Sequence, residues 1–227
     1  MPQEKSIDDY DYTGMQPHMP IDYLELKREI VAAAKRIFAE MNAQRAGETF
    51  LAFGFDVDSD VVTIAAFAVT RQDLQRKVEK SGDERFKDFF WWAIQEWPLW
   101  NAFPTHLGKA AKIVNRYVWE DPAEHSDQIF ILRKRNLLNI LADSLKELDE
   151  AGVFAAASKR EDFLLYLDNG DPGLEDAVMY LELARKINPP RIMERYEKHV
   201  RTMLELNGAT LEVMMKDLRD QGLLDTV

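Results

Sequence analysis

The chain has 227 residues, of which 46% are hydrophobic and 30% charged, and its formal net charge is −11. This length and composition are typical of a soluble globular protein with a sizeable core. The acidic balance argues against a nucleic-acid or anionic membrane surface, which needs clustered lysine and arginine. The absence of cysteine excludes disulfides, thiol catalysis and cysteine-ligated metals.

The amino-terminal quarter predicts an arm, a helix and a hairpin. Residues 1–20 are acidic and carry no periodicity, so we expect a flexible acidic arm. Apolar residues recur at helical spacing from Pro20 to about Gln44. The stretches 49–56 and 61–70 are rich in β-branched and aromatic residues and flank a short acidic turn, which predicts a β-hairpin.

The turn of this hairpin does not predict a metal site. Asp56, Asp58 and Asp60 alternate there, as in a calcium loop. Val61 and Phe67, however, stand where an EF-hand loop needs glycine and glutamate. The four histidines are scattered without metal-ligand spacing, and no Gly-rich phosphate loop is present. We therefore predict no metal and no cofactor.

The middle of the chain predicts three helices. Thr70, with Asp73 three residues on, forms a capping-box pattern before a short helix at 71–80. A second helix, capped by Asp83, is expected to run to Trp97 before Pro98. A third is expected at 105–119.

Four tryptophans gather within ten residues of this region: Trp91, Trp92, Trp97 and Trp100. They cannot all share one helical face, so some are expected at a domain edge. Such a cluster binds a base, a sugar or a protein partner in some proteins, but packing of a helix on a sheet is the commoner role.

The stretch from Leu137 to Asp171 predicts the central helix–strand unit. Leucines at three- and four-residue steps give a helix, whose first turns include the ambiguous residues 128–132. Gly152 stands where a left-handed cap belongs. The apolar run Phe163–Leu167 then predicts a buried strand.

The carboxyl end predicts three more helices. Asp171 is expected to cap a helix that begins at Pro172 and ends at Asn188, and two further helices follow at 191–206 and 210–221. Methionine-rich faces on the last two favour core packing, with a dimer seam as the alternative.

Only carboxylates remain as chemical candidates. The candidate binding set combines them with the tryptophans: Trp92, Glu96, Trp97, Trp100, Asp168 and Asp171. If Glu96, Asp168 and Asp171 met across a cleft, they could hold a cation or act as a carboxylate pair. No catalytic residue is assigned, because Asp168 and Asp171 are adequately explained as turn and cap residues.

Several short segments resemble a bacterial family known as DUF4303, a domain of unknown function. They are residues 50–56, Trp92-Ala-Ile-Gln-Glu96-Trp97, residues 144–154 ending in Leu-Asp-Glu-Ala-Gly-Val-Phe, and Ile187-Asn188-Pro189. The resemblance covers roughly residues 21–197 and implies no activity. It places any shared binding surface first at Glu96 and Trp97. By analogy of size and acidity, such proteins look like immunity proteins that neutralise toxins.

The sequence therefore predicts an α+β fold with a small, mainly antiparallel sheet covered by helices. We expect an arm at 1–20, one domain at 21–190 and a helical extension at 191–227. The leading functional hypothesis is a non-enzymatic protein-binding module, immunity-like, whose acidic surface meets a basic protein partner. The alternatives are an enzyme or ligand-binding domain that uses the carboxylates, and an oligomeric scaffold such as a homodimer. We expect no nucleic acid, no membrane and a cytoplasmic location.

Overall fold

The computed structural model describes residues 22–58, 63–120, 127–169 and 172–224. The predicted arm at 1–20 lies outside the described residues. The helices and strands, in chain order, are α1 (Tyr23–Gln44), β1 (Phe50–Val57), β2 (Ile64–Thr70), α2 (Arg71–Ser81), η2 (Glu84–Phe86), α3 (Lys87–Trp92), η3 (Ile94–Glu96), η4 (Pro104–Leu107), α4 (Gly108–Glu120), α5 (Asp127–Glu150), η6 (Arg160–Asp162), β3 (Leu164–Asp168), α6 (Leu174–Ile187), α7 (Pro190–Leu206) and α8 (Leu211–Asp220).

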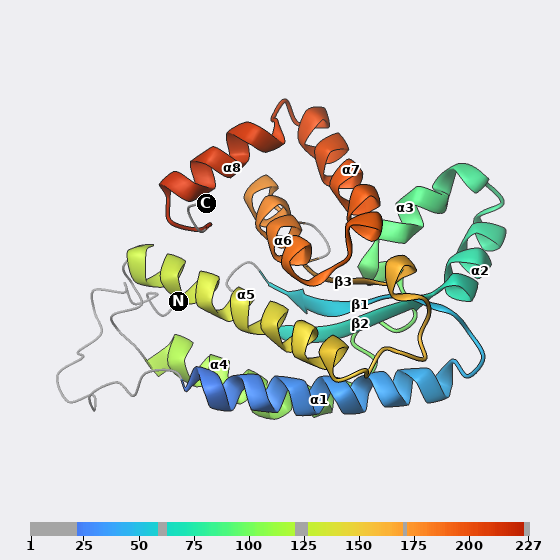
Figure 1. Ribbon diagram of the computed structural model, residues 1–227, viewed down its shortest axis with the longest axis horizontal. Helices are drawn as coiled ribbons and strands as arrows, with labels where there is room; N and C mark the ends of the chain where they lie inside the picture. Colours follow the sequence, from blue (N-terminus) through green and yellow to red (C-terminus); the bar gives the residue numbers. More distant parts are fainter. Residues whose placement is uncertain (1–21, 59–62, 121–126, 170–171, 225–227) are drawn as a thin grey trace, which may run out of the picture.

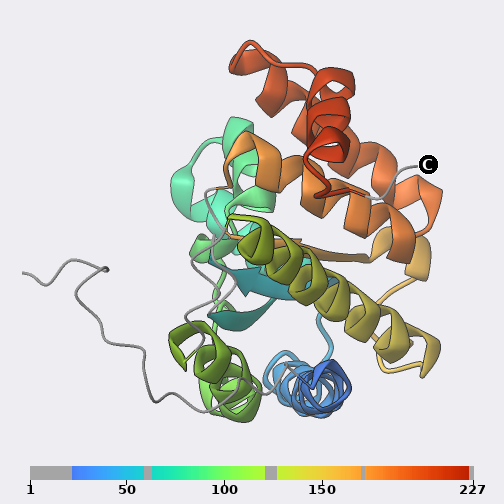
Figure 2. The same cartoon turned by 90° about the vertical axis from the view of Figure 1, so that its left-hand side faces the viewer.

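A small sheet lies between two layers of helices (Figure 1). In that view α1 and α4 lie below the sheet, α6, α7 and α8 lie above it, and α2 and α3 flank its right-hand end. The view turned by 90° shows the same separation, with α5 running beside the sheet (Figure 2). The α+β fold with a helical carboxyl-terminal extension is therefore confirmed. No helix of the described segments is long and apolar enough to cross a membrane.

The sheet has three strands in the order β2-β1-β3. β1 and β2 form the predicted antiparallel hairpin, whereas β1 and β3 pair in parallel from Ala52–Leu164 to Asp56–Asp168. The sheet is therefore mixed. The predicted buried strand at Phe163–Leu167 is confirmed as β3, shifted by one residue, and all of β3 is buried.

Local sequence signals set most element ends correctly. Thr70 and Asp73 form the predicted capping box of α2. At the end of α5, Gly152 has φ of 75°, and the Val153 amide donates to the Leu148 carbonyl at 3.0 Å. This is the Schellman ending that the sequence predicts, because a glycine accepts the left-handed conformation without strain.

The long aromatic helix predicted to end at Trp97 is wrong. α3 stops at Trp92, and Ala93 leaves the helical region with ψ of 73°. The break lets the Trp97 indole turn back, donate to the Phe90 carbonyl at 2.8 Å and pack against Phe67 of β2. Burial of a large ring on the sheet outweighed helical periodicity here.

Two helix starts also differ from the prediction. α6 begins at Leu174 with Gly173 as its cap, rather than at Pro172, while the predicted cap Asp171 lies outside the described residues. The helix expected from Thr105 begins as the 3₁₀ turn η4 and becomes α-helical only at Gly108.

The last two helices pack on the rest of the fold. α7 buries Met193, Tyr196 and Val200, and α8 buries Leu211 and Leu218. The remaining methionines of their apolar faces, Met203, Met214 and Met215, are partly buried against the same core. The methionine-rich faces are thus used within the chain. The division into a domain at 21–190 and an extension stays a prediction.

The open edge of β3 is closed by one side chain. Leu165 turns its amide and carbonyl away from β1, and the Asn188 amide group meets both, at 2.8 Å and 2.6 Å. Arg160 holds the neighbouring backbone by donating to the Ile187 carbonyl at 2.7 Å. It also donates to the Asp149 carboxylate at 2.6 Å. Unpaired backbone groups at the edge of a sheet can form hydrogen bonds with a strand of another chain. The contact with Asn188 prevents this at Leu165.

The packing at the centre of the sheet requires a glycine at position 54. Phe67, Gly54 and Tyr166 form one row across the three strands. The Phe67 and Tyr166 rings meet over Gly54 with centroids 5.0 Å apart. A Cβ at Gly54 would lie 2.0 Å from the Tyr166 carbonyl oxygen and 2.7 Å from the Phe67 ring.

We predict that Gly54→Ala lowers the free energy of unfolding by about 3 kcal/mol or more, because overpacking here meets backbone that cannot move aside. Gly108→Ala is the matched control. Gly108 is helical, and a Cβ added there would have no neighbour within 4 Å, so alanine should be neutral or stabilising. Urea denaturation of both variants checks this, and equal midpoints would contradict it.

We further predict that Asn188→Ala costs about 3 kcal/mol, since two backbone groups of Leu165 lose their partners together. Asn207, whose side chain donates to the Met203 carbonyl at the exposed end of α7, provides the comparison. Asn207→Ala should cost less than about 1 kcal/mol. Similar losses from the two substitutions, measured by thermal and chemical denaturation, would show that the edge contact is dispensable.

Candidate functional site

Two of the predicted binding residues belong to an aromatic layer above the sheet. Trp97 is 4% exposed and packs edge-on against Phe67. Trp92 stacks on Tyr196 and His199 of α7, with ring centroids at 5.4 Å and 4.4 Å. Trp92 packs between the sheet and α7, and Trp97 packs on β2, which are ordinary packing roles of such residues.

The other predicted residues divide into separate places. Glu96 is exposed and pairs with Lys77 of α2 at 3.0 Å. Asp168 is buried at the end of β3, beside Asp56 at the end of β1. Asp171 lies outside the described residues. The structure therefore brings Asp168 next to Asp56, and not next to Glu96.

Trp100 contacts the same end of β1. Its indole nitrogen donates to Asp56 Oδ2 at 2.6 Å. Burial raises the pKa of Asp56, while the hydrogen bond from Trp100 opposes this effect. Two neighbouring carboxylates favour a cation chemically, but no group of three or more histidine or acidic residues within the described part of the chain could hold a metal ion.

His199 is the titratable group of the aromatic layer. Its ring lies 14° from parallel to Trp92. Burial lowers the pKa of His199 to about 4, although the nearby Asp88 carboxylate opposes the shift. The imidazole is therefore neutral at physiological pH and acts as a flat apolar ring in the stack.

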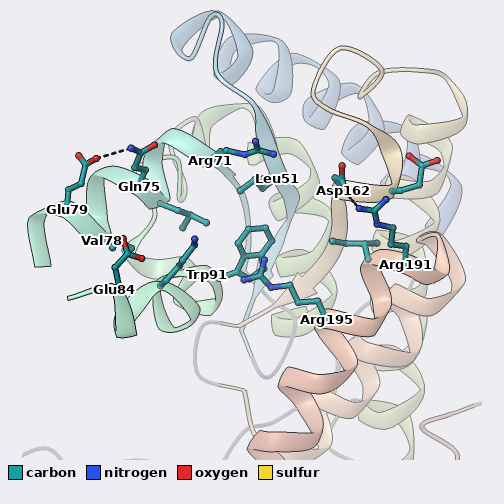
Figure 3. Close-up of a pocket in the computed structure, with 14 residues that line it drawn as sticks. Leu51, Arg71, Gln75, Val78, Glu79, Glu84, Trp91, Asp162, Arg191 and Arg195 are labelled. Atoms are coloured by element: carbon teal, nitrogen blue, oxygen red, sulfur yellow. Dashed lines mark hydrogen bonds and ion pairs between the residues drawn. The ribbon is translucent and has the colours of Figure 1, made fainter. Parts of the chain in front are cut away.

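A groove of about 760 Å³ opens between α2 and α3 on one side and η6 and α7 on the other (Figure 3). Its apolar surface comes from α2, α3, α7 and β1: Leu51, Leu74, Val78, Trp91 and Ile192. The volume lies within the range of small-molecule sites. None of the five described residues of the predicted binding set lines this groove.

Four cations line the groove: Arg71, Lys87, Arg191 and Arg195. The Arg195 guanidinium lies 3.7 Å from the centroid of the Trp91 ring, a cation–π contact, and also pairs with Asp88. Within the described residues, the side chains of Arg71 and Lys87 have no hydrogen-bond or ion-pair partner.

Four acids also line the groove: Glu79, Glu84, Glu161 and Asp162. Glu79 accepts a hydrogen bond from Gln75, and Asp162 pairs with Arg191 at 3.4 Å. In Figure 3, Arg71 lies next to Leu51 and Arg195 next to Trp91, whereas Glu79 and Glu84 lie on the side of α2 and η2 and Asp162 lies beside Arg191. The groove thus carries charges of both signs, with cations next to Leu51 and Trp91.

Three phenylalanines form a largely exposed patch at the end of η2 and on a face of α3 that does not line the groove. Phe86 and Phe89 are 47% and 59% exposed, and both contact the half-buried Phe90, with ring centroids at 6.1 Å and 5.5 Å. Spacings of three and four residues place them together, away from Lys87 and Trp91. We call Phe86, Phe89 and Phe90 the phenylalanine patch.

Sequence signals for these features are weak. Both β1 and β3 are apolar runs with an aspartate at or near their end, which indicates the Asp56–Asp168 pair only once the strands are known to be parallel neighbours. The groove has no such signal, because Arg71 and Arg195 are brought together by tertiary packing over a long chain separation. The phenylalanine patch lies within the long helix that the sequence wrongly predicts.

The fold and these surfaces define a small α+β domain with an aromatic layer, an exposed aromatic patch and a charged groove. The family model of DUF4303, a domain of unknown function, matches residues 26–189. The match covers more than half of the chain, and the protein belongs to this family. No curated protein and no solved structure is significantly similar to it.

The half-buried His199 predicts a specific pH dependence. The pKa of His199 is about 4 in the folded state and about 6.5 in the unfolded state, so the unfolded state binds the proton first as pH falls. Stability should therefore decrease by about 2 kcal/mol between pH 6.5 and pH 4 through this group. His199→Phe keeps the ring stack and removes the titration.

Carboxylates titrate in the same range, so the measurement is the difference between the two proteins. Urea unfolding at several pH values should give the wild type a steeper loss of stability than His199→Phe below pH 6.5. Parallel curves would mean that His199 takes up its proton at the same pH in the folded and in the unfolded protein.

Proposed function

We propose that this protein is a non-enzymatic protein-binding module that docks its partner on the phenylalanine patch. The observation that carries the proposal is the exposure of Phe86 and Phe89, 47% and 59%, within one cluster. Exposed aromatic rings cost solvation free energy, and contiguous ones mark interaction sites. Aromatic residues also supply most of the energy at the centres of protein interfaces.

The proposed partner presents an apolar surface surrounded by basic residues. The patch is flanked by Asp88, whose side chain is 87% exposed and pairs with Arg195. Lys77 lies over the Phe90 ring and pairs with Glu96, whose side chain is 58% exposed. The whole chain adds a net charge of −11. Acidic rim residues contribute chiefly to the rate of association and to the choice of partner.

An immunity-like role is the particular form of this proposal, with a basic toxin as the partner. Its support is the small size and acidity of the chain. In that case co-expression of the protein with the partner in a cytoplasmic host should protect the host from the partner's toxicity. Failure to protect would leave the binding proposal standing and remove the immunity role.

Position-specific photo-crosslinking tests the binding proposal. A photoreactive phenylalanine analogue is placed at position 89, and at position 206 as a control. Leu206 is 82% exposed but lies on α7, outside the patch. A partner that crosslinks from position 89 and not from position 206 is then purified for direct binding measurements.

The double substitution Phe86→Ser/Phe89→Ser should weaken binding of that purified partner at least about a hundredfold, because two aromatic hot-spot residues are lost. Leu206→Ser should leave the affinity unchanged. Raising the salt concentration should slow association of the wild type. Equal affinity of the double variant and the wild type would refute the patch as the docking site.

A further inference from the structure

The groove between α2–α3 and η6–α7 is a second, separate candidate for binding. It lies on a different face of α3 from the phenylalanine patch, and its volume of about 760 Å³ suits a small organic molecule. Its apolar surface can hold a hydrocarbon or aromatic body, and its charged side chains can hold a polar end.

Cations face this groove from both walls. Arg71 and Lys87 belong to α2 and α3, and Arg191 and Arg195 belong to α7. Guanidinium groups carry donors in a planar fork that matches the two oxygens of a carboxylate or phosphate. Arg71 and Lys87 have no partner within the described segments, so an anion between the walls would give them one.

The start of α7 adds a second feature that favours an anion. Its cap residue, Pro189, makes no side-chain hydrogen bond to the first turn. The amino end of this 17-residue helix therefore keeps its partial positive charge without a capping acceptor. Arg191 stands in that first turn and lines the groove.

The acids of the groove have a different placement. Asp162 is already engaged by Arg191, and Glu79 accepts from Gln75. Glu79 and Glu84 lie on the side of α2 and η2 in Figure 3, and Asp162 lies beside Arg191. The Arg195 guanidinium over Trp91 therefore favours a ligand whose anionic group lies towards that ring.

We propose that this groove binds a small amphipathic anion, whose apolar body lies on Leu51, Leu74 and Ile192 and whose carboxylate or phosphate is held by Arg71, Arg191 and Arg195. Neither the family assignment nor the protein-binding proposal includes such a site. The proposal needs no part of the phenylalanine patch, so the two stand or fall separately.

Calorimetric titration of the full chain with three probes tests it. The probes are 3-phenylpropionate, phenyl phosphate and the neutral alcohol 3-phenylpropan-1-ol, which share an aromatic body. At least one of the two anions should bind about tenfold or more tightly than the alcohol, since charge-assisted hydrogen bonds supply the difference. The tighter of the two anions identifies carboxylate or phosphate as the chemistry of the ligand.

Three variants assign the binding to the groove. Arg71→Gln and Arg195→Gln should each weaken the preferred anion about tenfold. Arg71 is exposed and unpaired in the described structure, so its variant should fold even if the loss of the Arg195–Trp91 contact is disruptive. Arg85→Gln, at a position where the side chain is 90% exposed and pairs with Asp83 outside the groove, should change nothing.

Three results would overturn the proposal. One is the absence of saturable binding by either anion in the millimolar range. The second is equal binding of the anions and the alcohol, which would reduce the groove to a non-selective apolar surface. The third is equal affinity of Arg71→Gln and the wild type, which would place the bound anion away from the proposed site. Retention of anion binding by Phe86→Ser/Phe89→Ser would show that this site is independent of the protein-binding surface.

Discussion

The fold depends on how the backbone groups at the unpaired edge of β3 find hydrogen-bond partners. β3 is a five-residue strand that pairs on one side with β1 and, within the described residues, has no strand on the other. The Asn188 side chain supplies a donor and an acceptor to Leu165, as the backbone of a neighbouring strand would. It also donates to the Ala184 carbonyl at 2.8 Å. One residue thus joins the sheet to the end of α6 and gives the resemblance at Ile187-Asn188-Pro189 a physical meaning.

The same strand positions the aromatic layer. Tyr166 meets Phe67 across Gly54, and the Trp92 and Tyr196 rings pack on it from α3 and α7. Because α3 is only six residues long and has two buried or half-buried tryptophans, its orientation is set by this layer more than by its own hydrogen bonds. That orientation is what turns the phenylalanine patch outward and Trp91 towards the groove.

The sequence predicted those parts of the fold that depend on contacts between residues close together in the chain. The capping box at Thr70, the glycine ending of α5 and the β-branched and aromatic residues around the hairpin turn each place an element end through contacts within a few residues. The parallel pairing of β1 with β3, the break at Ala93 and the groove were not predictable in this way. Each arises from packing between residues far apart in the chain, as the indole of Trp97 on Phe67 shows. The predicted binding set named tryptophans that pack on the sheet, because composition alone does not separate a buried ring from a displayed one.

The net charge of −11 is compatible with an anion site at the arginines of the groove, because electrostatic effects in water are local. Charges farther apart than about 8 Å are largely screened at physiological ionic strength. The overall charge therefore acts on the approach of a large partner, whereas the affinity for a small anion depends on the groups within its immediate contact. Arg195 lies at the meeting point of the two surfaces, over Trp91 in the groove and paired with Asp88 of α3. Its guanidinium is already oriented by the indole, so an incoming anion gains a donor whose side-chain entropy has been lost in folding and not in binding.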